Sequence, residues 1–206
     1  MCANIKEVRA QELANYAGYD QPQAVRDLCG FGHPMDYPVP VLTDFGLLTV
    51  WGPMIRVLAD GLGVKLDRID TVTDRRPLDR TINVDGMGDF EAGTQGALRF
   101  EVRGIVNGRP LLVVEHVTRI DDDCAPDWPR SDPGGGFHRV VISGQPTLTV
   151  TVDGDDQSEP GTAAGGNASA ANRIVNAIPA VCDAEPGPIH PLDLPTIVGS
   201  GQLKVD

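Results

Sequence analysis

The amino-acid sequence predicts an α+β domain in which a mostly antiparallel sheet of about five or six strands carries helices on one face. Three observations support this: a long segment of helical periodicity at residues 43–63, a series of segments with the period of two typical of strands, and a second helical segment after them. Helices and strands are grouped rather than alternating, which favours α+β over a parallel βαβ arrangement. Without an internal repeat or a break in composition, residues 1–206 are expected to form a single domain.

The first half of the chain predicts helices before strands. Residues 5–13 fit a charged strand or a short helix, and a short helix is expected from Pro22 to Gly30. The strongest helix runs from a cap at Thr43 or Asp44 to Gly61 or Gly63, with a bend at the Gly52-Pro53 pair. From residue 64 the apolar residues recur with a period of two, which indicates the start of the sheet.

The second half predicts a hairpin, two further strands and a helix. Residues 96–120 contain two apolar runs joined at Asn107-Gly108, a dipeptide favoured in two-residue turns because both positions need positive φ. Strands are also expected at residues 137–142 and 147–152. After a polar loop, a helix is expected from about Asn167 to Ile178, with Pro179 ending it.

Composition excludes several classes of protein. Lys and Arg total 17 against 29 Asp and Glu, a net charge of −12, so binding to nucleic acid or to an anionic membrane has no electrostatic support. No apolar run reaches the ~18 residues of a membrane span, and the amino terminus does not resemble a signal peptide, so we expect a cytoplasmic protein. The four cysteines lie far apart and form no C-x-x-C pair, which favours reduced thiols over a zinc site or a disulfide framework.

The segment LLVVEHVTRI, residues 111–120, places ionisable groups at one end of a strand. With Asn107-Gly108 as the turn, Glu115 is expected opposite Phe100, on an apolar face that it shares with Arg119. His116 is expected on the other, wetter face, opposite Arg99. A buried carboxylate is costly unless paired, so Glu115 and Arg119 fit either a structural ion pair or a polar ligand site.

Three other residues are candidates for lining a site. Asp127 and Trp128 follow the same strand, where they fit either the wall of a cleft or a plug at the sheet edge, and Asn176 lies late in the second predicted helix. The sequence contains no G-x-G-x-x-G between a strand and a helix, no Walker A, no G-x-S-x-G and no H-E-x-x-H pattern. No catalytic residue, cofactor-binding residue or metal ligand is therefore assigned from motifs.

Several stretches of sequence, in one order, resemble a known family. They are YAGYD (residues 16–20), ADGLGVKLD (59–67), EHVTRI (115–120), CAPDWP (124–129) and RIVNAIPAVCDAEPG followed by LDLP (173–195). These resemble the C-terminal domain of 2,4-diaminopentanoate dehydrogenase-like proteins, which are relatives of dihydrodipicolinate reductase and of the native amine dehydrogenases. The resemblance covers nearly the whole chain.

The resemblance implies the substrate-binding and dimerisation portion of an NAD(P)-dependent oxidoreductase that acts on an amine or imine carbon, as a homodimer. It implies substrate-side roles for residues in the matching stretches: Glu115, His116, Arg119, Asp127, Trp128 and Asn176. Full-length relatives begin with a Rossmann domain, whose fingerprint is missing here, so we expect this chain alone to bind neither NAD nor NADP and to be inactive. A free-standing binding or interaction module without catalysis is the alternative.

Overall fold

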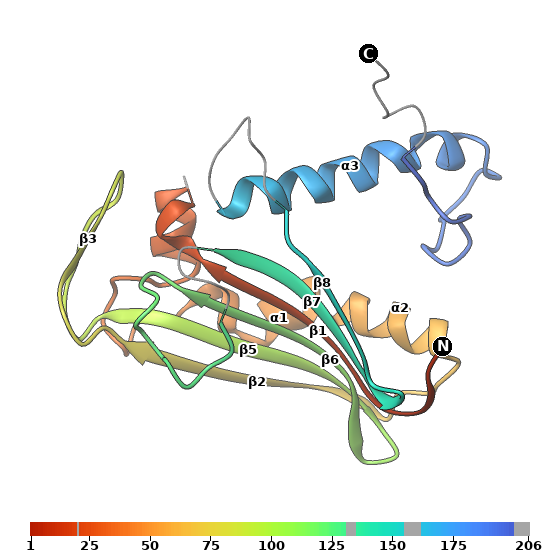
Figure 1. The fold of residues 1–206 in the computed structure, drawn as a ribbon, viewed down its shortest axis with the longest axis horizontal. Coiled ribbons are helices and arrows are strands. Elements are labelled where there is room, and N and C mark those ends of the chain that lie inside the picture. Colours follow the sequence, from red (N-terminus) through yellow and green to blue (C-terminus); the bar gives the residue numbers. More distant parts are fainter. Residues whose placement is uncertain (20, 131–134, 155–161, 200–206) are drawn as a thin grey trace.

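The computed structural model describes residues 1–19, 21–130, 135–154 and 162–199. Its main element is a six-stranded sheet in the order β2-β5-β6-β1-β7-β8 (Figure 1). All neighbouring strands are antiparallel except β1 and β6, which are parallel. The strands are β1 Ala3–Asn15, β2 Arg68–Pro77, β5 Gln95–Val106, β6 Arg109–Arg119, β7 Gly136–Gln145 and β8 Leu148–Val152. The predicted α+β class with a mostly antiparallel sheet is confirmed.

Strand β1 occupies the centre of the sheet. Its alternation of exposed and buried positions resolves the open choice between strand and short helix for residues 5–13 in favour of a strand. It lies between β6 and β7, which follow it by about a hundred residues in the chain. The contacts of β1 are therefore long-range, and local periodicity gives no information about them.

The long predicted helix is present as two helices that meet at the expected bend. Thr43 caps the amino terminus of helix α1 (Asp44–Val50), and its side chain accepts a hydrogen bond from the Gly46 amide. Gly63, in the left-handed region, caps the carboxy terminus of α2 (Gly52–Leu62). The two axes differ by 43°. Among the described residues, no single helix is long and apolar enough to span a membrane. The bent pair of α1 and α2 has sufficient length and apolar composition only when the two helices are taken together.

The hairpin of β5 and β6 is confirmed, with Asn107 at φ 49° and Gly108 at φ 72°. Its predicted register is wrong beyond the first pairs. Ile105 pairs with Pro110, as expected from the turn, but Gly104 pairs with Leu112, so Leu111 forms a β-bulge. From there on, each residue of β6 faces the opposite side of the sheet from the one predicted, because the side chains of a strand alternate with a period of two.

Several element boundaries also differ from the prediction. Strand β2 begins at Arg68 rather than at residue 64. The short helix expected from Pro22 is present: residues 22–23 are helical and continue into a π-helical turn, η2 (Ala24–Leu28). Helix α3 spans Thr162–Cys182, so it begins before Asn167 and continues past Pro179. The proline lies in the last turn, and although it lacks an N–H donor, its carbonyl still accepts from Asp183. Of the polar loop expected at residues 153–166, residues 155–161 lie outside the described residues and residues 162–166 belong to α3.

The remaining elements are short. Two 3₁₀ turns, η1 (Tyr16–Gly18) and η3 (Pro40–Leu42), connect the larger elements, and strands β3 (Ile82–Val84) and β4 (Gly88–Phe90) form a separate hairpin that projects beyond one end of the sheet (Figure 1).

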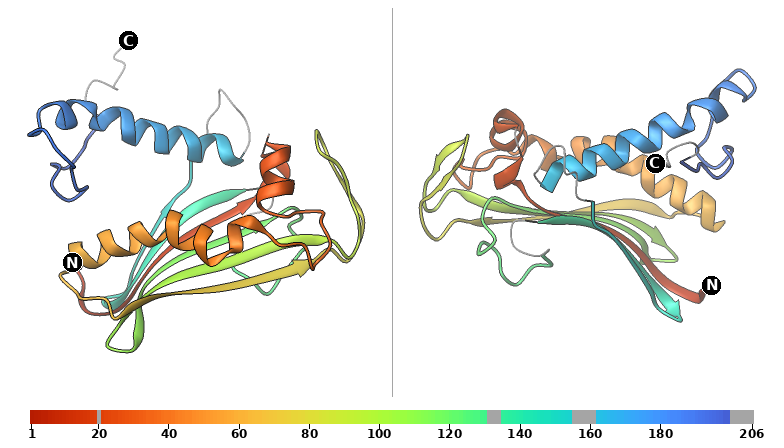
Figure 2. Two further views of the ribbon diagram at one scale, coloured as in Figure 1. Left: turned by 180° about the vertical axis from the view of Figure 1, so that it is seen from behind. Right: turned by 45° about the horizontal axis from the view of Figure 1, so that its top comes forward.

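The helices lie on one side of the sheet, and the segment after β6 lies on the other (Figure 2). Helix α2 covers β5 and β6, and α1 contacts β2. Trp51, between the two helices, packs on Phe100 at 4.5 Å between ring centroids. Helix α3 contacts β1, β7 and η1 instead. At Gly104 the sheet approaches α2 so closely that an added Cβ would lie 2.7 Å from Ile55 Cγ2. Part of the buried core therefore lies between the sheet and α2.

Candidate functional site

The bulge at Leu111 exchanges the two sides that the sequence predicted for Glu115 and His116. Glu115 pairs with Glu101, and His116 pairs with Phe100. His116 thus lies on the face covered by helices, whereas Glu115 and Arg119 lie on the opposite face. The predicted apolar surroundings of Glu115, and the predicted pairing of His116 with Arg99, are wrong because the register is shifted by one residue.

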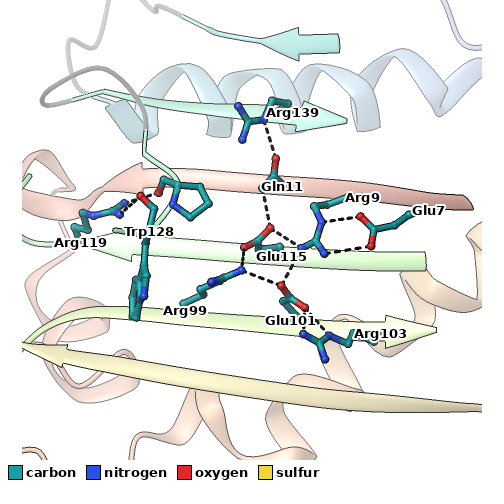
Figure 3. A network of polar contacts seen from close by, with 11 residues as sticks. Glu7, Arg9, Gln11, Arg99, Glu101, Arg103, Glu115, Arg119, Trp128 and Arg139 are labelled. Atoms are coloured by element: carbon teal, nitrogen blue, oxygen red, sulfur yellow. Dashed lines mark hydrogen bonds and ion pairs between the residues drawn. The ribbon is translucent and has the colours of Figure 1, made fainter. Parts of the chain in front are cut away.

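Glu115 is the centre of an ion-pair network on the face without helices (Figure 3). Its carboxylate is 1% exposed, and Oε2 lies 2.7 Å from Arg9 Nη1 and accepts a hydrogen bond of 2.7 Å from Gln11 Nε2. Oε1 lies 2.6 Å from Arg99 Nη2. Both oxygens of Glu115 therefore have partners, and none of them is Arg119.

Glu101 extends the same network across the next strand. Its Oε1 lies 2.9 Å from Arg9 and 3.0 Å from Arg99, and its Oε2 contacts Arg103. Burial alone would raise the pKa of Glu101, but its hydrogen bonds and ion pairs with Arg9 and Arg103 hold that pKa below the ordinary value. Glu7 also pairs with Arg9 at 3.0 Å, so three carboxylates face three guanidinium groups. This balance is typical of a structural network rather than of a site that awaits a charged ligand.

Arg119 has a different role from the one expected. Its guanidinium is 3% exposed and donates to the backbone carbonyls of four residues in the segment after β6: Cys124, Ala125, Trp128 and Pro129. Trp128 is buried there, under the guanidinium of Arg76 at 4.9 Å, and the exposed Asp127 lies 3.9 Å from the same arginine. Arg119 therefore fixes this segment against the sheet, on the face opposite the helices.

On the helical face, three ionisable residues form one row across three neighbouring strands. Glu12 of β1 pairs in register with both His116 of β6 and His138 of β7. Glu12 Oε2 lies 3.3 Å from His116 Nδ1 and 3.8 Å from His138 Nε2. The row thus places one carboxylate between two imidazoles, and it exists because β1 is inserted between β6 and β7.

The imidazole of His116 is held from several sides. It stacks on Phe100 with 5.1 Å between ring centroids and 3° between planes, and Tyr16 approaches it edge-on at 6.3 Å. Nε2 is hydrogen-bonded to the hydroxyl of Thr118, two residues along the same face. His116 is buried, so its orientation toward Glu12 is set by packing as well as by polar contacts.

The electrostatics of the row favour an ionised carboxylate. Burial would raise the pKa of Glu12, but the hydrogen bond and charge of His116, with a contribution from His138, hold the pKa below its ordinary value. Burial, reinforced by the nearby charge of Glu12, raises the pKa of Tyr16, so the phenol stays protonated. At neutral pH the row therefore presents an anion beside a neutral hydroxyl group.

Two cavities meet at this row. One, of about 300 Å³, lies between the row and the first half of α3 and includes Tyr16, Tyr19 and Asn167 among its lining residues. The other, of about 740 Å³, lies between α2 and the sheet and includes Trp51, Met54 and His116. Glu12 and His138 line both. We call the second cavity the α2 groove.

Among the six residues proposed from the sequence, His116 lines the α2 groove with its side chain. Glu115 borders the groove only through its backbone, because its carboxylate points into the network on the opposite face. Asn176 is half-buried on α3 and does not line either cavity. The sequence did not identify Glu12 and His138, because their proximity to His116 depends on the order of the strands. Tyr16 lies within the YAGYD stretch, but no role was predicted for it.

The described residues show neither a metal-ligand cluster nor the topology of a dinucleotide-binding turn. They contain no cluster of three or more His, Cys, Asp or Glu side chains that could hold a metal ion. In the same part of the chain, the one parallel strand pair, β1 and β6, is not linked by a glycine-rich turn that leads into a helix, as dinucleotide binding requires. The glycine-rich turn of a dinucleotide-binding fold is therefore not found among these residues.

The fold and the row together define an α+β domain with a cleft lined by one carboxylate and two imidazoles. Residues 48–202 match the model of the 2,4-diaminopentanoate dehydrogenase C-terminal domain family. An amine dehydrogenase from Streptomyces virginiae is 50% identical over 200 residues, which are 97% of this chain and 55% of that protein. The chain belongs to the 2,4-diaminopentanoate dehydrogenase C-terminal domain family, and the resemblance seen in the sequence is confirmed.

The structure of an amine dehydrogenase from Mycobacterium smegmatis has the same fold, with a TM-score of 0.62 over 97% of this chain and 54% of that chain, at 18% identity. The chain therefore spans about half the length of the relatives that it matches.

Proposed function

We propose that this chain is the substrate-binding and dimerisation part of an NAD(P)-dependent oxidoreductase that acts on an amine or imine carbon. The observation that carries the proposal is the row Glu12–His116–His138, which sets an ionised carboxylate in a cleft of a domain from a dehydrogenase family. The 50% identical relative bears the name amine dehydrogenase, which agrees with this substrate class.

The row has the chemistry needed to bind an amine. An ammonium or iminium nitrogen is a cation with N–H donors, and a partly buried carboxylate is its natural acceptor. The two imidazoles both approach Oε2 of Glu12, and no ion pair to Oε1 is found in the part of the chain that the structure describes. In this proposal Oε1 accepts from the substrate nitrogen while His116 holds the carboxylate in place.

NAD(P) would supply the hydride acceptor or donor for such a reaction. The glycine-rich dinucleotide turn is not found among the described residues, so we assign the cofactor to another part of the protein and assign no chemical step to this chain. The function proposed for its residues is to bind and orient the amine, as effective catalysis requires.

Two further parts of the proposal concern assembly and location. We assign a second copy of the chain as the partner, with the sheet face that carries the Glu115 network as the surface free of helices (Figure 2). We also assign the protein to the cytoplasm, in keeping with four cysteines that are all free thiols. Light scattering after size exclusion tests the first assignment, and a monomer at micromolar concentration would refute it.

Titration of the chain with isopropylamine, followed by amide chemical shifts in NMR spectra, tests the binding role. We expect shifts concentrated at the strand segments around Glu12, His116 and His138, and loss of this binding in Glu12→Gln. Glu7→Gln is the matched control, because it removes the same charge from the same strand on the opposite face. Equal binding by both variants would refute an amine site at the row.

A further inference from the structure

The floor of the α2 groove changes from polar to apolar within one pleat. Glu12, His116 and His138 form the first row; the next row toward the amino terminus of β1 consists of Ala10, Val114 and Val140, which also pair in register. Both rows line the same groove. A ligand bound at Glu12 therefore has an apolar surface directly beside it on three strands.

The wall of the groove is also apolar. It is formed by α1 and the first turns of α2, and Pro191 of the carboxy-terminal segment also lines the groove. The contributing residues of the helices are Val50, Trp51, Pro53, Met54, Val57 and Leu58. Several remain exposed, Val50 by 54% and Met54 by 49%, although their side chains are large and apolar. Exposed apolar side chains that surround one groove indicate a surface for an apolar ligand.

Apart from the two imidazoles that pair with Glu12, the described residues that line the groove present no cationic side chain to it. Arg139 contributes to the floor, but its guanidinium donates to Gln11 Oε1 on the opposite face, where Gln11 in turn donates to Glu115 (Figure 3). Nothing in the lining therefore matches a second, anionic group on the ligand. The complementary ligand has one cationic end for Glu12 and an uncharged apolar remainder.

We propose that the α2 groove binds an extended alkyl substituent of the amine, with the nitrogen at Glu12 and the chain lying over Ala10, Val114 and Val140. This inference rests on the proposed amine-binding role and adds the shape of the ligand. Two residues of a strand span about 7 Å. At about 1.3 Å per backbone bond in an extended chain, this distance corresponds to about five carbons. Each buried methylene contributes about 0.8 kcal/mol, so affinity should rise about fourfold per carbon.

The test is a titration of the chain with unbranched primary amines from ethylamine to octylamine, by calorimetry or NMR. The dissociation constant should fall about fourfold per carbon and level off when the chain exceeds about five carbons. Butanol to octanol, which have the same chains without the cation, should bind more weakly at every length. A dissociation constant that does not change with chain length, while ethylamine still binds at Glu12, would overturn the groove assignment and leave the amine site intact.

A pair of variants locates the binding. Val140→Ser changes the floor of the groove, and Val150→Ser makes the same change at its neighbour on β8, which lines neither cavity. We expect Val140→Ser to raise the dissociation constant of hexylamine about tenfold and to leave that of ethylamine unchanged. Val150→Ser should change neither dissociation constant. Equal effects of the two variants would overturn the assignment. If no amine of any length binds at Glu12, the proposed function fails together with this inference.

Discussion

Replacing Glu115 by alanine tests the central feature of the uncovered sheet face. The carboxylate is 1% exposed and has three close partners, Arg9, Gln11 and Arg99, at 2.6–2.7 Å. Its removal leaves two guanidinium groups that retain only their contacts with Glu101 and, for Arg9, with Glu7.

The expected loss of stability follows from the burial of these groups. Removing one member of a buried ion pair costs on the order of 3–5 kcal/mol, because the remaining charge is left without compensation. Arg9 and Arg99 are 22% and 31% exposed, so water screens them in part. We therefore expect Glu115→Ala to lower the free energy of unfolding by about 3 kcal/mol, at the lower end of this range. Glu7→Ala breaks a pair with the same Arg9 in which the carboxylate is 29% exposed, and should cost less, about 1 kcal/mol.

Urea denaturation with a common m-value measures both losses. A double-mutant cycle then identifies the partner: Glu115→Ala and Arg9→Met should couple by at least about 1 kcal/mol, whereas Glu115→Ala and Arg119→Met should be additive within about 0.5 kcal/mol. Equal losses for Glu115→Ala and Glu7→Ala, or a large coupling between Glu115 and Arg119, would refute the network described here.

Three further predictions concern other parts of the domain. Because the pKa of folded Glu101 lies below its ordinary value, its contribution to stability is complete above about pH 5 and is lost as the pH falls through that lowered pKa; the difference in Tm between the wild type and Glu101→Gln should shrink from pH 6 to pH 3. Gly104→Ala should cost about 1–3 kcal/mol by forcing α2 away from the sheet, whereas Gly61→Ala, with 3.7 Å of space in a helix, should stabilise by about 0.5–1 kcal/mol, as urea curves can show. Calorimetry of the chain with NADH or NADPH should show no micromolar binding, and stoichiometric binding would contradict the assignment of the cofactor to another part of the protein.

The elements that depend on local sequence were predictable. The Thr43 cap, the bend at Gly52-Pro53 and the Asn107-Gly108 turn each rest on the preference of a residue for one backbone conformation, and all three are present. Pro179 was interpreted by the same logic and wrongly, because its effect depends on how far the helix continues beyond it. The conformational preferences of single residues thus predict that a helix or turn is present better than they predict the residue at which it ends.

The candidate site was predictable only in part, because it is assembled by pairing between distant strands. His116 was identified from its position at a polar strand end, but Glu12 and His138 reach it only because β1 lies between β6 and β7. No local pattern in residues 3–15 specifies a parallel neighbour, since parallel pairing requires a long crossover whose course is set by packing of the whole domain.

The bulge at Leu111 decides which of two adjacent residues enters the cleft. Glu115 and His116 are adjacent in a strand, so their side chains must lie on opposite faces of the sheet. The Asn107-Gly108 turn without a bulge would place Glu115 on the helical face and His116 on the other face. Without the bulge, Glu115 would face Phe100 and Trp51, where no arginine compensates its charge, and His116 would be separated from Glu12. One extra residue, four positions before the carboxylate, directs Glu115 to Arg9 and Arg99 and His116 to Phe100 and Glu12. The ion-pair network and the amine-binding row therefore depend on the same irregularity, and shortening β6 by deletion of Leu111 should disrupt both at once.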